Sequence, residues 1–275
     1  KEKNRGTYTS QADQKKYNRK LEFKLRNMEL LYSSAKLNGF EKEFNLEKLW
    51  KILLKNQFHD ILPGSCVHDV YQDAVEDYER LDTSLEDIKN ELFAFFSTKY
   101  RLDHNQFIIF NPLSFERNDL IEIKKEELEK EYDSVTINNI RYPVQKSNNT
   151  YYFKPNHLSP LTFTKLKFSN DKNIKYENHL NSSQYLIENK YIKVTLDKKG
   201  QISSIFDKEK DIEYIQANQK ANQLKLYDDK STYFDTWDIS ISEQNKKVID
   251  NIKDIKVKAA GPYFYSIEIK RDFYD

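Results

Sequence analysis

The sequence contains one cysteine, Cys66, so no disulfide bond can form within the chain. This excludes a small secreted scaffold held together by disulfides, and it fits a reducing compartment. No apolar run approaches the roughly 20 residues that a membrane-spanning helix needs, which excludes a membrane-inserted protein. Residues 1–6 contain neither an initiator methionine nor an apolar signal core. We therefore expect the chain to be cut from a longer one.

An excess of charge of either sign is also missing, because 45 Lys and Arg residues face 44 Asp and Glu residues, for a net charge of +1. Such a balance gives no overall field to hold a nucleic acid or an anionic membrane, so neither is an expected partner. Hydrophobic residues make up 38% of the 275 residues and include 19 Tyr and 17 Phe, which is enough for a packed core. The length suggests roughly two domains.

The first hundred residues contain very little glycine or proline and carry three apolar stripes with spacings of three and four residues. The first helix is expected to begin after Thr9 or Ser10 and to end at Asn38-Gly39. The second is expected to begin after Asn45 and to end at Leu62, because Pro63 and Gly64 follow. The third covers residues 67–95. Short connections between such helices predict an antiparallel three-helix bundle over residues 1–104.

After residue 105 the sequence changes to short runs rich in Ile, Val, Tyr, Phe and Thr, separated by turn residues. The turn signals include Asn138-Asn139 and Lys199-Gly200. Many short strands without helices between them predict an antiparallel β-sandwich over residues 105–275, incomplete because Asp275 directly follows a strand. The fold class is then α+β by domains. The expected strands are residues 106–110, 120–123, 135–137, 151–153, 162–168, 191–196, 202–206, 255–259 and 263–270.

The segment NQFHDILPGS, residues 56–65, has the most unusual chemical content. Buried polar groups at a helix end must be satisfied, so a structural interpretation has Asn56 and His59 capping carbonyl groups and Asp60 pairing with a neighbouring chain. A functional interpretation makes His59 a metal ligand and Asp60 a substrate contact. The other histidines lack the close spacing of zinc motifs, so any metal site needs ligands from outside this chain.

Other catalytic signatures are missing. The sequence has no G-x-S-x-G elbow, no Walker loop and no G-x-G-x-x-G motif. Cys66 with His59 or His68 as its base would make a thiol nucleophile, but a half-buried structural thiol is the stronger interpretation. The 56–65 segment therefore remains the main candidate site.

Several segments, in order along the chain, resemble the middle of bacterial-type α-mannosidases of glycoside hydrolase family 38. The likeness begins with RGTYTSQ at residues 5–11 and NRK at residues 18–20, and continues through residues 49–65. It extends to NPLSFER at residues 111–117, YLIENKY at residues 185–191, NQL at residues 222–224 and YFDTWDI at residues 233–239. Any one of these matches is weak, but several in the family's order make a chance resemblance improbable.

The resemblance implies an N-terminal β/α barrel, absent here, followed by a helical bundle and β-sandwich domains. It implies a zinc cofactor with His59 as the fourth ligand, and it implies that Asp60 hydrogen-bonds sugar hydroxyls. Tyr233, Trp237 and Asp238 would line the substrate, although Tyr233 and Trp237 fit structural aromatics of a sandwich edge equally well. The implied reaction is retaining hydrolysis of terminal α-mannosides in glycans.

The chain departs from the family pattern because it has no His-x-Asp pair and no identifiable nucleophile or general acid. We therefore expect it to be inactive alone, to bind zinc weakly, and to work with the barrel of the same parent chain. The Lys, Asn and Ile usage suggests a bacterial cytoplasmic protein. Two alternatives remain open: a stand-alone carbohydrate-binding sandwich whose aromatics stack on sugars, and a structural interaction module that docks through the bundle.

Overall fold

The computed structural model describes residues 4–170, 174, 180–229, 236–239 and 241–273. The chain divides into two compact units. The helical unit comprises residues 1–102 and 228–242, and the β unit comprises residues 103–227 and 243–275. The bundle is therefore joined by a short segment from late in the sequence.

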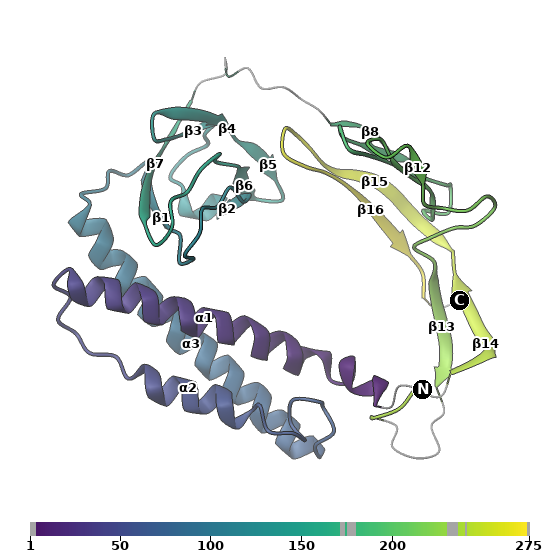
Figure 1. The fold of residues 1–275 in the computed structure, drawn as a ribbon, viewed down its shortest axis with the longest axis horizontal. Coiled ribbons are helices and arrows are strands. Elements are labelled where there is room, and N and C mark those ends of the chain that lie inside the picture. The colour runs from purple at the N-terminus through teal and green to yellow at the C-terminus, as the bar shows by residue number, and fades with distance from the viewer. Residues whose placement is uncertain (1–3, 171–173, 175–179, 230–235, 240, 274–275) are drawn as a thin grey trace. The chain divides into compact units, whose positions relative to one another are not determined.

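Three helices build the helical unit: α1 (Ala12–Leu37), α2 (Leu46–Lys55) and α3 (His68–Lys99), preceded by the short 3-10 helix η1 (Arg5–Tyr8). They lie antiparallel, each to the next (Figure 1). Their apolar stripes face inward, and several leucines have no exposed surface. These leucines are Leu21, Leu25, Leu53, Leu81, Leu85 and Leu92. The predicted three-helix bundle is confirmed.

The ends of the helices follow the capping residues only in part. The Asn45 side chain accepts a hydrogen bond from the Lys48 amide at 2.9 Å, and Asn38 caps α1 before Gly39, which has a φ of +93°. The residue before α1, however, is Gln11, so the expected start at Thr9 or Ser10 was early.

The expected end of the second helix at Leu62 was wrong, because α2 ends at Lys55 and residues 56–64 form consecutive turns. Asn56 stops the helix. Its side-chain amide donates to the Ile52 carbonyl at 3.0 Å and also to a carboxylate of α3. His59 and Asp60 consequently lie in turns beyond the helix and not in its last turns.

The first part of the β unit is a two-sheet sandwich. One sheet has the order β1-β7-β3-β4, with β1 (Gln106–Phe110), β7 (Phe163–Ser169), β3 (Ser134–Ile137) and β4 (Ile140–Pro143). The other has the order β2-β6-β5, with β2 (Ile121–Lys124), β6 (Thr150–Phe153) and β5 (Gln145–Ser147). Neighbouring strands in both sheets pair antiparallel, and one core joins the two sheets through Ile123, Phe153, Val135 and Phe168. Asn138 and Asn139 form the predicted hairpin turn, with φ values of 50° and 64°.

Further strands follow the sandwich. A five-stranded sheet has the order β12-β11-β10-β9-β8, and β13-β14 and β15-β16 form two-stranded sheets. The pairings within the five-stranded sheet and between β15 and β16 are antiparallel, so helices followed by antiparallel sheets confirm the α+β class. Their bounds are β8 (Asn181–Ser183), β9 (Leu186–Glu188), β10 (Ile192–Leu196), β11 (Ile202–Asp207), β12 (Ile212–Glu213), β13 (Leu224–Asp229), β14 (Ile241–Ile249), β15 (Ile252–Ala260) and β16 (Tyr265–Arg271).

A buried glutamine fastens the β15-β16 hairpin to the sandwich. The Gln145 side chain is nearly fully buried; its amide nitrogen donates to the Phe264 carbonyl at 2.9 Å, and its oxygen accepts from the amides of Tyr263 and Phe264. A Cβ at Gly261 would lie 2.4 Å from this side chain, so only glycine fits there.

None of the helices in the described ranges is long and apolar enough to cross a lipid bilayer.

Candidate functional site

His59 and Asp60 lie together on the surface at one end of the helical unit. The His59 Nε2 atom is 3.4 Å from Asp60 Oδ2, and the two side chains are 74% and 49% exposed. The Phe58 ring packs beside the imidazole, with 4.2 Å between the ring centroids, and is itself half exposed. The imidazole is therefore free to face a ligand and is not part of the bundle core.

The start of the loop at residues 56–66 is fixed to the bundle. Asn56 is almost fully buried, and its side-chain nitrogen lies 3.0 Å from Asp77 Oδ2 on α3. The Tyr78 hydroxyl donates to the Asn56 carbonyl oxygen at 3.3 Å. The loop therefore leaves the bundle from a residue held at both its side chain and its backbone.

The charges around Asp77 keep this anchor ionised. Burial opposes ionisation of Asp77, but hydrogen bonds from Lys55 and Asn56, with the charges of Lys55 and Arg80, hold the pKa of its carboxyl below the ordinary value. Burial, and then the charge of Asp77, raise the pKa of Tyr78 to about 12. Tyr78 thus stays a neutral donor to Asn56 near neutral pH.

The far end of the loop is fixed to α1. The Lys15 ammonium donates to the Pro63 carbonyl at 2.7 Å and also to the Ser10 carbonyl, and burial lowers the pKa of this lysine. Gly64 has a φ of +81°, and a Cβ there would lie 2.7 Å from the Ser10 carbonyl oxygen. Close approach and left-handed backbone together favour glycine at this position.

Turn hydrogen bonds order the middle of the loop. The amides of Ile61 and Leu62 donate to the Phe58 carbonyl, at 3.0 and 3.1 Å, and the Ser65 amide and hydroxyl donate to the Asp60 carbonyl. Gln57 reaches α1 through a 3.0 Å hydrogen bond to Asn18. The backbone beside His59 and Asp60 is thus held while both side chains stay open.

Two more of the predicted substrate contacts lie near the start of the chain. The Gly6 amide donates to the Trp237 carbonyl at 2.9 Å, and the Ser10 hydroxyl donates to the Thr236 carbonyl at 2.9 Å. Trp237 is half-buried, and Asp238 is exposed. Ser10 therefore contacts residue 236 while its own carbonyl binds Lys15, which also holds Pro63. Tyr233 lies outside the described residues.

The donor set around His59 fits only part of a zinc site. Zinc takes three or four protein ligands, usually imidazole, thiolate or carboxylate groups. Within the residues that the structure describes, no three His, Cys, Asp or Glu side chains gather closely enough to hold a metal ion. His59 with Asp60 could supply one or two ligands, and the chain does not form a complete site alone.

Cys66, the candidate thiol nucleophile, is partly buried at the end of the same loop. Burial raises the pKa of its thiol; a backbone hydrogen bond opposes this rise, and the nearby Asp60 carboxylate adds to it. Because the thiolate is the reactive form, this environment favours an inert structural thiol.

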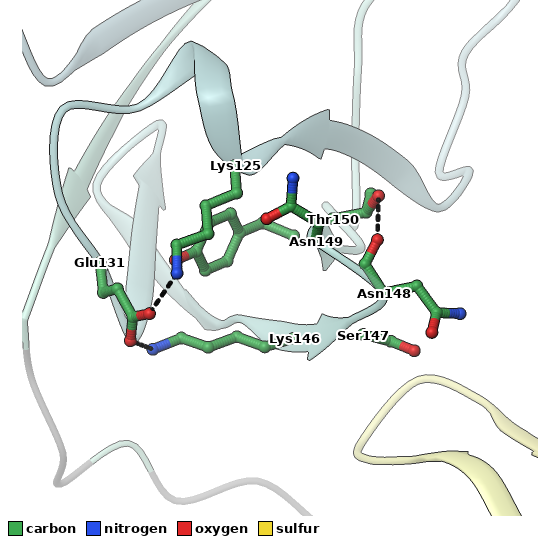
Figure 2. A pocket seen from close by; sticks show the side chains of 8 residues that line it. Lys125, Glu131, Lys146, Ser147, Asn148, Asn149 and Thr150 are labelled. Atoms are coloured by element: carbon green, nitrogen blue, oxygen red, sulfur yellow. Dashed lines mark hydrogen bonds and ion pairs between the residues drawn. The ribbon is translucent and has the colours of Figure 1, made fainter.

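A separate hollow of about 240 Å³ lies on the sandwich, beside the turn at Asn148 and Asn149. Figure 2 shows Lys125 and Lys146 converging on Glu131, at 2.6 and 3.4 Å, and Lys146 also pairs with Asp133 at 3.1 Å. These carboxylates neutralise both ammonium groups, so the hollow has no uncompensated charge to attract an ion.

Comparisons with known proteins identify the family. A family model described as the α-mannosidase middle domain matches residues 2–95, and one described as the glycosyl hydrolases family 38 C-terminal domain matches residues 187–275. The chain belongs to glycoside hydrolase family 38. The two matched segments coincide with the helices and with the later strands of this family 38 chain.

Relatives of the family 38 chain agree along most of its length. It is 30% identical to α-mannosidase G of Dictyostelium discoideum, over 91% of this chain and 27% of that protein. It is 28% identical to α-mannosidase 2C1 of Mus musculus, over 85% of this chain and 21% of that protein. The chain thus spans about a quarter of the length of these relatives.

A solved structure has the same fold. The crystal structure of an α-mannosidase from Enterococcus faecalis V583 matches 97% of this chain and 35% of its own chain, with a TM-score of 0.70 and 17% identity. At that identity the match supports the arrangement of helices and sheets and says nothing about individual site residues.

Sequence patterns missed the residues that hold the candidate site. Asp77 and Lys15 look like ordinary charged residues of amphipathic helices, and their partners lie 21 and 48 positions away. Gly6 gave one signal, since glycine outside an obvious turn suggests a close backbone approach. That approach is to residues 236 and 237.

Proposed function

We propose that this chain is the middle part of a zinc-dependent, retaining α-mannosidase that hydrolyses terminal α-mannosides of glycans. The observation that carries the proposal is the similarity to an α-mannosidase over 91% of the chain, together with two matching domain models. The exposed His59 and Asp60 pair, in a loop fixed at both ends, supports it from the structural side.

In this proposal His59 contributes one zinc ligand and Asp60 binds a sugar hydroxyl. The remaining ligands and the barrel come from other parts of the parent protein. Tyr233, Trp237 and Asp238 are proposed to line the substrate. Trp237 and Asp238 lie on a segment bound to residues 6 and 10. Ser10 in turn is joined through Lys15 to the loop that carries His59.

Retaining hydrolysis requires two carboxyl groups about 5–5.5 Å apart, one as nucleophile and one as acid. We assign neither role to a residue of this chain. The isolated chain is therefore proposed to be inactive, with activity appearing only when the barrel is present.

The test uses the protein of the full reading frame and an aryl α-mannoside substrate. We expect hydrolysis with α-mannose as the first product by ¹H NMR, about one zinc per molecule by elemental analysis, and no turnover by residues 1–275 alone. His59→Ala should lower zinc content and activity by about 100-fold or more, since a lost ligand opens the site.

The matched control is His157→Ala. His157 lies in the β unit and pairs with Glu116 at 2.6 Å, far along the chain from the loop. Full zinc content and activity in His59→Ala would overturn the ligand role. Robust turnover by residues 1–275 would overturn the division of labour, and β-mannose as the first product would overturn the retaining mechanism.

A further inference from the structure

We propose that Asp77 is a positioning residue for the loop that carries His59, and that it acts through Asn56. Its importance for catalysis rests on the proposed function of His59, whereas the positioning itself can be measured in this chain without metal or substrate. Asp77 touches neither His59 nor Asp60 in the described structure and is not offered as a ligand.

Asp77 anchors the loop through its buried carboxylate. The Asp77 side chain is 9% exposed, and its carboxylate accepts from three groups. Asn56 Nδ2 lies 3.0 Å from Oδ2, Arg80 lies 2.5 Å from Oδ1, and the Lys55 ammonium pairs with Oδ2. Asn56 is thus the only one of the three partners that belongs to the loop.

Asn56 controls where α2 ends and the loop begins. It is the residue that caps α2, with φ and ψ of −80° and −1°, and turns replace the helix after it. Asp77 holds the Asn56 side chain, and the neighbouring Tyr78 holds its carbonyl. Two adjacent residues of α3 therefore fix the direction in which the loop departs, three residues before His59.

The position of the His59 side chain depends on the backbone of the loop. Its side chain contacts Phe58 and Asp60, both neighbours in sequence and both substantially exposed. The imidazole of a metal ligand must be held within a fraction of an ångström of its required place. Here that precision has to come from the backbone of the loop, and hence from its anchors.

Asp82 is a carboxylate that stabilises the helical unit without contacting the loop, which distinguishes it from Asp77. It also lies on α3 and pairs with two lysines of α1, Lys20 at 2.5 Å and Lys24. Neither lysine belongs to the loop. Removing Asp82 should weaken packing between α1 and α3 and leave the loop direction unchanged, so it is the matched control.

The experiment compares Asp77→Ala, Asp77→Asn, Asn56→Ala and Asp82→Ala in the metal-free chain. Histidines labelled with ¹³C at Cε1 give signals from the five imidazoles, and a His59→Gln variant assigns the His59 signal. Hydrogen exchange of the Ile61, Leu62, Gly64 and Ser65 amides, each hydrogen-bonded in the loop, reports local opening.

We expect Asp77→Ala and Asn56→Ala to shift the His59 signal in the same way and to speed exchange of the loop amides at least about tenfold. Asp77→Asn should restore most of both, because its carboxamide oxygen can still accept from Asn56. Asp82→Ala should change neither. Combining Asp77→Ala with Asn56→Ala should add little, since both remove one interaction.

An unchanged His59 signal in Asp77→Ala would overturn the proposal, as would an equal shift in Asp82→Ala. If Asp77→Ala does not fold, Asn56→Ala gives the same decision, because it removes the same interaction from the other side. In the full-length protein, Asp77→Ala is expected to weaken zinc retention about tenfold or more, and Asp82→Ala is not. An unchanged His59 signal in Asp77→Ala would count against the positioning, whereas normal zinc retention in His59→Ala would count against the proposed function, so the two failures are distinguishable.

Discussion

The three helices and the five-stranded sheet bury their side chains to very different extents. In α3 a buried residue occurs at almost every turn, and Leu81, Leu85 and Leu92 have no exposed surface. In strands β9, β10 and β11, all of which the structure describes, the residues are half-buried or exposed, and none is fully buried.

A regular hydrophobic pattern in the sequence therefore does not by itself determine how deeply the side chains are buried. Helical stripes find cover within their own unit, because three helices of this length enclose a core. The strands of the five-stranded sheet rely on main-chain pairing and on partial cover of each face. Local stability should therefore be high in the bundle and low in this sheet.

Paired core substitutions give the largest expected effect. Leu81→Ala should lower the free energy of unfolding of the helical unit by about 3 kcal/mol, because it leaves a cavity in a filled core. Ile205→Ala in β11, half-exposed, should cost about 1 kcal/mol or less. Both tryptophans lie in the helical unit, so their fluorescence in a denaturant titration reports Leu81→Ala.

Hydrogen exchange of β10 and β11 reports the effect of Ile205→Ala. A loss for Ile205→Ala as large as that for Leu81→Ala would mean that the sheet has a tightly packed core after all. The contrast between the two regions would then disappear.

Glycine substitutions sharpen the comparison within the helical unit. Gly39 and Gly64 both have positive φ, +93° and +81°, but a Cβ at Gly39 meets nothing within 4 Å while one at Gly64 meets the Ser10 carbonyl. Gly39→Ala should cost about 1 kcal/mol from backbone strain alone. Gly64→Ala should cost about 1–2 kcal/mol more, because backbone must move as well.

Thermal or denaturant unfolding of the two variants measures this difference. Equal losses would show that the loop at residue 64 shifts away from α1 without cost. The loop would then be less firmly held than its contacts suggest.

The sequence predicted the bundle well because a buried stripe leaves a periodic signal that needs no knowledge of the partner. Strand β1 matched its predicted bounds, and β7 matched to within one residue at each end. Strands β4, β5, β8, β9, β12, β13 and β14 were missed. Apart from β14, which has nine residues, they have two to six residues and are held mainly by pairing with neighbours, which local patterns do not record.

The sequence singled out the segment of the candidate site but gave it the wrong local structure. Residues 56–65 were singled out because polar groups followed an apolar helix, and that reasoning found His59 and Asp60. The helix was expected to continue to Leu62 because proline and glycine were the strongest breakers in view. The actual stop is Asn56, fixed by Asp77 of the next helix, and a contact between helices leaves no mark in local sequence.

The anchor at the far end of the loop gives a smaller effect than the glycine. Lys15→Met keeps much of the apolar stem and removes hydrogen bonds to the Pro63 and Ser10 carbonyls. It should lower the free energy of unfolding of the helical unit by about 1–2 kcal/mol, as expected for a charged donor. Lys16→Met, on an exposed neighbour, should change it by less than about 0.5 kcal/mol.

Exchange of the Gly64 amide should rise in Lys15→Met and stay unchanged in Lys16→Met, which hydrogen-exchange mass spectrometry can follow. If both variants behaved alike, the lysine would not hold the loop. The end of the loop would then depend on the Gly64 contact alone.

Acid titration gives the smallest effect and tests the charges of α3. The pKa values of Asp77, Asp82 and Glu86 are all lowered, because hydrogen bonds from lysines and, at Asp77, from Asn56 outweigh the effect of burial. A lowered folded-state pKa gives stability that is complete above the unfolded value, about 3.9 for Asp, and is lost as pH falls through the folded value.

The free energy of unfolding of the helical unit should therefore fall below about pH 4, by less than about 1 kcal/mol for each of these carboxylates. Asp82→Asn should flatten that dependence, whereas Glu79→Gln, at an exposed position of the same helix, should leave it unchanged. Chemical unfolding at pH 3 and pH 6, followed by tryptophan fluorescence, measures the slope. A slope that survives Asp82→Asn unchanged would assign the acid sensitivity of the helical unit to the other two carboxylates of α3, Asp77 and Glu86, whose pKa values are also lowered.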